Sequence, residues 1–275
     1  MIDPADPDQL FDLMRRHRIT LKSRLGQNFM VDQSMRDAVA DAAGIAPDDD
    51  VLEVGAGVGT LTVALARHAA RITAVEFDRD LVPALREVVA DLPNVDVVQA
   101  DILRHDMHGE SIVVGNIPYN LTGALIRKLL DRPPRPRRLS LVVQKEVAER
   151  WTAIGGASVA TVAVQVFAIA HIVFTIPASA FTPEPRVDSA LVILDVRDRP
   201  AVDVDDFDAF FRFVESVFQQ RRKQLAGTLG RLNGEGSKQA AARLRDAGID
   251  PERRPQTLGL AEWEAIFRSF GATAS

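Results

Sequence analysis

The chain has 275 residues, of which 47% are hydrophobic and 26% are charged. This size and composition are typical of one large globular domain, or of a large domain with a small second one. The absence of cysteine excludes disulfides, a catalytic thiolate, iron–sulfur clusters and cysteine-based zinc sites. No uninterrupted apolar run reaches membrane-spanning length and the N-terminus is acidic, so we expect a soluble, cytoplasmic protein that contacts no membrane.

The chain as a whole carries a net charge of −5, but two of its regions are basic. Residues 220–254 contain nine lysines and arginines against four acids, and residues 132–138 contain four arginines and no acid. Nucleic acid responds to the local field of such patches, so both runs are candidate nucleic-acid contacts. An ordinary solvated face remains the alternative interpretation of each run.

In chain order, an acidic helix and loop are expected over residues 6–29 and a helix over 32–43. Short apolar runs then alternate with helical stretches, which is typical of an α/β fold whose parallel strands are buried on both faces. The predicted strands are 51–54, 71–75, 95–98, 112–114 and 139–143, and the predicted helices are 60–68, 80–90 and 121–130.

Two further strands are predicted around 168–175 and 190–196. The connection between them is too short for a crossover helix, so the mostly parallel, Rossmann-like sheet should end in an antiparallel strand pair. Residues 204–270 predict helices only. We therefore expect an N-terminal extension and loop (1–30), an α/β domain (31–199) and a small C-terminal all-helical domain (200–275).

A glycine-rich loop follows the first predicted strand of the sheet and opens a helix: Gly55, Ala56, Gly57, Val58 and Gly59. Glycine permits a tight turn and a close approach of the backbone to a ligand. Glu76 ends the next strand, 21 residues past Gly55, where a carboxylate can accept hydrogen bonds from ribose hydroxyls. Together they predict a cofactor that contains a nucleoside, with a purely structural turn as the alternative.

Two cofactors compete for this loop. A dinucleotide motif requires a third glycine where this chain has Thr60, so NAD is disfavoured. S-adenosylmethionine has no pyrophosphate and needs a polar partner for its adenine amine, which Asp101 could supply while Ile102 packs against the ring. A helix N-cap is the alternative role for Asp101.

The tetrapeptide Asn116-Ile117-Pro118-Tyr119 follows the fourth predicted strand, at the sheet edge where open α/β folds bind ligands. The Asn116 side-chain oxygen and the Ile117 carbonyl could accept both N–H groups of an adenine amine and direct its lone pair at a methyl donor. Pro118 would stiffen the turn and Tyr119 would stack on an extruded base. Loop geometry alone is the competing explanation.

Six ordered stretches resemble the small-subunit ribosomal RNA adenine N6,N6-dimethyltransferase family over about residues 25–225. They are Gly26–Phe29, Glu53–Thr62, Asn116–Asn120, Gln144–Arg150, Phe181–Ala190 and Phe218–Leu225. The family's fold is a Rossmann-like methyltransferase domain with a helical RNA-binding domain. The resemblance implies that the chain is an S-adenosylmethionine-dependent enzyme.

The resemblance also implies roles for individual residues. Asn28 and Met30 would close over the methionine end of the cofactor, and Phe181 would join Tyr119 in sandwiching the base. The remaining cofactor contacts would be Gly55, Ala56, Gly57, Glu76, Asp101, Ile102 and Asn116. The phosphate contacts would be Arg135, Arg137, Arg138, Arg221, Arg222 and Lys223.

The activity that the resemblance implies is dimethylation of two adjacent adenosines in the 3′-terminal hairpin of small-subunit (16S) rRNA, with a role in small-subunit biogenesis. The partner would be the rRNA or a partly assembled small subunit, and we expect no metal and a monomer. Two alternatives stay open: a large-subunit (23S) rRNA adenine methylase, and a non-catalytic RNA-binding assembly or transcription factor. The chain departs from the family at Ala56, often a proline, and at residues 155–159, where a tyrosine-containing segment is usual.

Overall fold

The computed structural model describes residues 2–271 except 23–24, 118–120, 131–133 and 154. The chain divides into two compact units, which are described separately below. One comprises Met1–Glu149 and Ala170–Val196, and the other comprises Arg150–Ile169 and Arg197–Ser275. The division into domains at residues 199 and 200, which the sequence predicted, remains a prediction. Within the described ranges, every helix is too short or too polar to cross a membrane.

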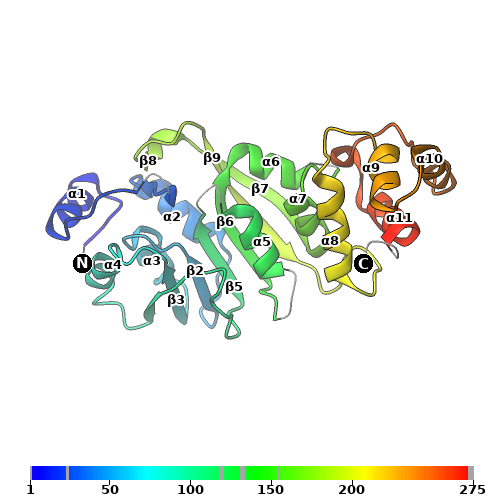
Figure 1. The fold of residues 1–275 in the computed structure, drawn as a ribbon. Coiled ribbons are helices and arrows are strands. Elements are labelled where there is room, and N and C mark those ends of the chain that lie inside the picture. Colours follow the sequence, from blue (N-terminus) through cyan, green and yellow to red (C-terminus); the bar gives the residue numbers. More distant parts are fainter. Residues whose placement is uncertain (1, 23–24, 118–120, 131–133, 154, 272–275) are drawn as a thin grey trace. The chain divides into compact units, whose positions relative to one another are not determined.

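A seven-stranded sheet forms the centre of the first unit, in the order β4-β3-β2-β5-β6-β9-β7 (Figure 1). Its strands are β2 (Asp50–Val54), β3 (Arg71–Glu76), β4 (Val95–Gln99), β5 (Ile112–Asn116), β6 (Arg138–Gln144), β7 (Ala168–Ile176) and β9 (Ser189–Val196). The strands from β4 to β6 pair in parallel, and β9 pairs antiparallel to β6. The predicted fold class is confirmed.

Five helices of this unit lie within stretches predicted to be helical, and a sixth, at residues 145–152, was not predicted. They are α1 (Pro7–Arg16), α2 (Gln33–Ala42), α3 (Thr60–Leu65), α4 (Val82–Val88), α5 (Thr122–Leu130) and the first residues of α6 (Lys145–Thr152). Strand residues such as Leu52, Ile72 and Val114 are fully buried. Burial of these side chains removes apolar surface from water and holds the helices against the sheet.

The acidic N-terminal extension forms α1, which begins at the N-cap Asp6. The Asp6 carboxylate accepts hydrogen bonds from the backbone N–H groups of Asp8 and Gln9, which have no partner inside the helix. In this helix (Figure 1, blue), Leu10 and Leu13 are buried. Arg16 forms an ion pair with Glu87 of α4. The helix is therefore part of the folded unit.

A second, two-stranded sheet was not predicted. β1 (Phe29–Met30) pairs antiparallel with β8 (Phe181–Thr182), which follows the 3₁₀ turn Ala178–Ala180. Two-residue strands carry too short a pattern to be identified from sequence. Their pairing ties the N-terminal loop to a segment about 150 residues further along the chain, as the register Met30↔Phe181 shows.

The second unit is helical, with an aromatic core. Its helices are α7 (Val159–Phe167), α8 (Phe207–Phe218), α9 (Leu225–Leu232), α10 (Ser237–Asp246) and α11 (Leu260–Phe270), with a 3₁₀ turn at Pro255–Thr257. Phe167 of α7 lies against Phe207 and Phe211 of α8, and Phe210 meets Phe267 edge-on. The helical content predicted for residues 204–270 is present.

Candidate functional site

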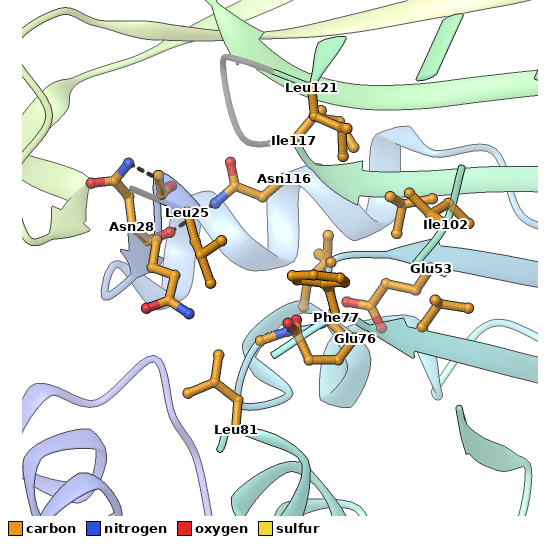
Figure 2. A pocket seen from close by; sticks show the side chains of 18 of the residues that line it. Leu25, Asn28, Glu53, Glu76, Phe77, Leu81, Ile102, Asn116, Ile117 and Leu121 are labelled. Atoms are coloured by element: carbon orange, nitrogen blue, oxygen red, sulfur yellow. Dashed lines mark hydrogen bonds between the residues drawn. The ribbon is translucent and has the colours of Figure 1, made fainter. Parts of the chain in front are cut away.

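A hollow of about 320 Å³ lies at the carboxyl ends of β2, β3 and β5 (Figure 2). Open α/β sheets place ligands at this edge. Of the residues predicted to contact cofactor or target, those that line the hollow are Asn28, Met30, Gly55, Ala56, Gly57, Glu76, Asp101, Ile102, Asn116 and Ile117. The structure therefore brings together residues from five separate parts of the sequence.

Three glycines of the loop adopt backbone conformations that other residues disfavour. Gly55, Gly57 and Gly59 have φ values of 70°, 61° and 93°, in the left-handed region that side chains disfavour. A Cβ atom at Gly57 would also lie 3.1 Å from the ring of Phe29. The backbone N–H of Gly57 donates a hydrogen bond to a carboxylate oxygen of Glu76 at 2.7 Å.

Glu76 is the acid predicted to meet ribose hydroxyls. One of its oxygens accepts from Gly57, and the other accepts from the backbone N–H of Asp78 at 2.7 Å. Burial raises the pKa of Glu76, and these backbone donors act in the opposite direction. Each carboxylate oxygen can accept more than one hydrogen bond, so the fixed side chain can still bind a hydroxyl.

Asp101 precedes a turn rather than a helix, so it is not a helix N-cap. Its carboxylate accepts a hydrogen bond from the backbone N–H of Leu103 at 3.0 Å, as a local turn cap does. It also lines the hollow, together with the buried side chain of Ile102. The local hydrogen bond restrains a carboxylate that lines the hollow, and its recognition of adenine remains a prediction.

Glu53 lines the same hollow, although the sequence analysis gave it no role. It is 1% exposed, and among the described residues its Oε2 atom has no hydrogen-bond partner. Burial raises its pKa to about 7, the Thr62 hydroxyl opposes the shift, and the charge of Glu76 adds to it. The signal in the sequence was an acid within an otherwise apolar strand directly before the glycine loop.

Asn116 ends β5 at the edge of the hollow (Figure 2). Its Nδ2 atom donates to the backbone oxygen of Asn28 at 3.0 Å, which leaves the side-chain oxygen as the acceptor predicted for the target amine. The backbone N–H of Ile117 donates to Val142 of β6, which fixes the chain where it leaves the strand. Pro118 and Tyr119 lie outside the described residues.

Phe181, which was predicted to stack on the target base, lies in β8. It is 3% exposed, lies opposite Met30 in the two-stranded sheet, and does not line the hollow. Its stacking on the target base remains a prediction.

The basic residues form two groups. Arg137 pairs with Asp49 at 2.5 Å and Arg138 with Asp195 at 2.7 Å, while Arg135 donates to the backbone oxygen of Leu130. Arg138 begins β6, whose other end is level with the hollow, so the structure does not bring this group to the site. Arg221, Arg222 and Lys223 belong to the second unit and are exposed. RNA contacts by either group remain predictions.

Comparison with known proteins identifies relatives along nearly the whole chain. The family model for ribosomal RNA adenine dimethylase matches residues 18–270. The "Ribosomal RNA small subunit methyltransferase A" of Geobacillus thermodenitrificans (strain NG80-2) is 38% identical, with 96% of each chain covered. The protein of the same name from Pelotomaculum thermopropionicum is 39% identical, with 98% of each chain covered.

Solved structures with the same fold include the 23S rRNA methyltransferase ErmE. It is 29% identical, with a TM-score of 0.67 over 88% of this chain and 99% of that one. A dimethyladenosine transferase from Plasmodium falciparum has a TM-score of 0.73 at 24% identity, over 89% of this chain and 98% of that one. The second likeness concerns the fold alone.

The fold and the hollow at the carboxyl edge of its sheet define a Rossmann-like methyltransferase. The chain belongs to the ribosomal RNA adenine dimethylase family. The resemblance inferred from its six sequence stretches is confirmed.

Proposed function

We propose that this protein transfers methyl groups from S-adenosylmethionine to N6 of two adjacent adenosines near the 3′ end of small-subunit (16S) rRNA. The observation that carries the proposal is the position of Asn116 at the edge of the hollow. Its side-chain nitrogen donates to Asn28, and its side-chain oxygen accepts no hydrogen bond from the described residues. The names of the curated relatives, which match over nearly their full length, support the small subunit as the substrate.

The residues around the hollow fit S-adenosylmethionine. Glu76 and Asp101 offer carboxylates for ribose hydroxyls and an adenine amine, and Ile102 offers an apolar surface for the ring. Glu53 adds a buried oxygen without a partner among the described residues, which suits a ligand that carries a cationic group. When bound, this cofactor supplies an activated methyl group on a sulfonium.

The protein's own contribution is positioning and electrostatics. The oxygens of Asn116 and Ile117 would accept hydrogen bonds from the two N–H groups of the adenine amine. These bonds would favour a pyramidal nitrogen, whose lone pair can attack the methyl group. No acid is needed to activate the methyl donor. Two methylations of each adenosine require that the same oxygens also hold a monomethylated amine, which retains one N–H.

The experiment incubates the protein with methyl-labelled S-adenosylmethionine and small ribosomal subunits from a strain without this modification. The RNA is then digested and the labelled nucleoside identified, with large subunits from the same strain as a control. Dimethyladenosine in the small subunit alone is the expected result. Label only in the large subunit would assign the chain to the 23S methylases, and RNA binding without label would assign it to non-catalytic assembly factors.

A further inference from the structure

Four polar residues outside the predicted site form a connected cluster beside the hollow. Lys22 donates to Asp78 at 2.5 Å and to Asp80 at 2.6 Å, and the Gln27 side chain donates to the other oxygen of Asp78 at 2.7 Å. The Gln27 side-chain oxygen accepts from the backbone N–H of Lys22 at 2.8 Å. We call these residues, Lys22, Gln27, Asp78 and Asp80, the Asp78 cluster.

The Asp78 cluster joins the N-terminal loop to the end of β3. Asp78 is 4% exposed, and its backbone N–H donates to Glu76, the acid predicted to bind ribose. Asp78 is therefore hydrogen-bonded on one side to the N-terminal loop and on the other to a predicted cofactor contact. Neither Lys22 nor Asp78 lines the hollow, so neither is placed to touch a ligand there.

The loop that the cluster fastens covers the hollow. All six residues from Leu25 to Met30, here the cover segment, line it. At its far end the cover segment is held by the β1–β8 pairing and by the hydrogen bond from Asn116 to the backbone oxygen of Asn28. At its near end, side-chain hydrogen bonds of the Asp78 cluster hold it.

The charges explain why a lysine is needed at this end. Glu76, Asp78 and Asp80 lie within five residues, and like charges so close together repel one another. Lys22 pairs with two of these acids, and its hydrogen bonds help to hold the pKa of Asp78 below the usual range against the effect of burial. A neutral residue at position 22 would remove both of these ion pairs and leave Asp78 and Asp80 without the charge of Lys22.

We propose that Lys22 and Asp78 are positioning residues, which hold the cover segment closed over bound S-adenosylmethionine and keep the Glu76 carboxylate oriented toward its ribose. The inference rests on the proposed function for the identity of the ligand. Closure matters because a ligand's apparent affinity falls with the fraction of protein in the binding-competent state. Substitutions at Lys22 or Asp78 leave the far end of the cover segment with its β1–β8 pairing and its hydrogen bond to Asn116, so the expected effect falls on cofactor binding rather than on the chemical step.

The first test measures movement of the cover segment without any ligand. Hydrogen exchange followed by mass spectrometry compares peptides spanning residues 18–31 in the native protein, in Lys22→Met and in Lys128→Met. Lys128 is a matched control because its side chain is 29% exposed, against 27% for Lys22, and it forms an ion pair with Asp106. We expect faster exchange in these peptides for Lys22→Met only. Equal exchange in all three proteins would overturn the proposal.

The second test measures binding of S-adenosylhomocysteine by calorimetry and steady-state methylation of small subunits. Lys22→Met and Asp78→Asn should raise Kd and the KM for S-adenosylmethionine by about tenfold, with kcat within about twofold. Lys22→Arg, which keeps the charge and the donors, should restore most of the affinity. A kcat loss without a change in Kd would contradict the assigned role.

The two proposals fail in different ways. If the native protein binds neither S-adenosylmethionine nor S-adenosylhomocysteine, the proposed function is wrong. If the native protein binds them and both variants bind equally well, the proposed function stands and the positioning role is wrong. Circular dichroism of each variant separates loss of binding from loss of folding, and Asp78→Asn provides an independent variant if Lys22→Met does not fold.

Discussion

The side chain of Asn116 and the backbone of Asn28 are joined by a hydrogen bond of 3.0 Å. This bond uses the amide nitrogen of Asn116, so the amide oxygen is the atom left to face an incoming amine. It also joins the end of β5 to the cover segment. The residue proposed to hold the target amine is thus oriented by the same segment that covers the cofactor hollow.

We predict that Asn116→Ala abolishes methyl transfer and leaves RNA affinity nearly unchanged. The substitution removes the acceptor that aligns the target amine but no positive charge. Single-turnover methylation of small subunits and filter binding of the same subunits measure the two effects separately. A methylation rate within about tenfold of the native rate would contradict the amine-holding role.

Glu53→Gln tests the buried acid. The pKa of Glu53 is about 7 in the folded protein against 4.5 for an ordinary glutamate, so the folded state binds more protons between these values. The stability of the native protein should therefore fall as the pH rises from 4.5 to 7, and should change no further above that range through this group. Relative to Glu53→Gln, the native protein should lose on the order of 2–3 kcal/mol across this window, measured by urea unfolding at several pH values. A constant difference between the two proteins would contradict the raised pKa.

The sheet could be predicted because its signals are local. Continuous apolar runs at regular spacing mark buried parallel strands, and every strand predicted between residues 51 and 144 is present within two residues of its expected ends. Helix α7 was missed because Val159, Val162 and Val164 suggest a strand by composition. The helix begins at the N-cap Ser158, whose hydroxyl accepts a hydrogen bond from the backbone N–H of Thr161. The apolar residues that follow led away from recognising this cap in the sequence.

The candidate site was predictable as a set of residues but not as a set of contacts. Motifs at strand ends meet because parallel strands share one edge, which is why Gly55, Glu76 and Asn116 lie around one hollow. The ion pairs of Arg137 and Arg138 could not be predicted, since their partners Asp49 and Asp195 are remote in sequence. The Asp78 cluster was missed for the same reason.

Gly115 allows β5 to lie against β2 next to the site. A Cβ atom there would lie 2.6 Å from the backbone oxygen of Val54 and 2.8 Å from the side chain of Ile117. We expect Gly115→Ala to destabilise the protein by about 1–3 kcal/mol and to slow methylation by displacing Asn116. Gly227→Ala is the control, because this glycine lies in α9 with no atom near its added Cβ and should gain up to about 1 kcal/mol. If Gly115→Ala and the native protein were equally stable in urea unfolding, the close approach of Gly115 to Val54 would be contradicted.

Arg221 and Arg222 test the second unit as an RNA-binding element. Both are exposed, and neither pairs with an acid within the ranges that the structure describes. Changing both to alanine should weaken subunit binding and reduce the slope of log affinity against log salt by about one contact each. Arg137→Ala is the comparison, because its guanidinium is already paired with Asp49 and its loss should alter the slope less. A slope unchanged by the double substitution would remove this segment from the interface.

The second unit is built from two separate stretches, Arg150–Ile169 and Arg197–Ser275. Phe167 of the first stretch packs on Phe207 and Phe211 of the second, so each stretch leaves an apolar face uncovered without the other. A chimaera made with a relative at residue 200 alone would mismatch these aromatic contacts. Exchanging the second unit between relatives therefore requires both stretches to be exchanged together, with α7 transferred alongside α8.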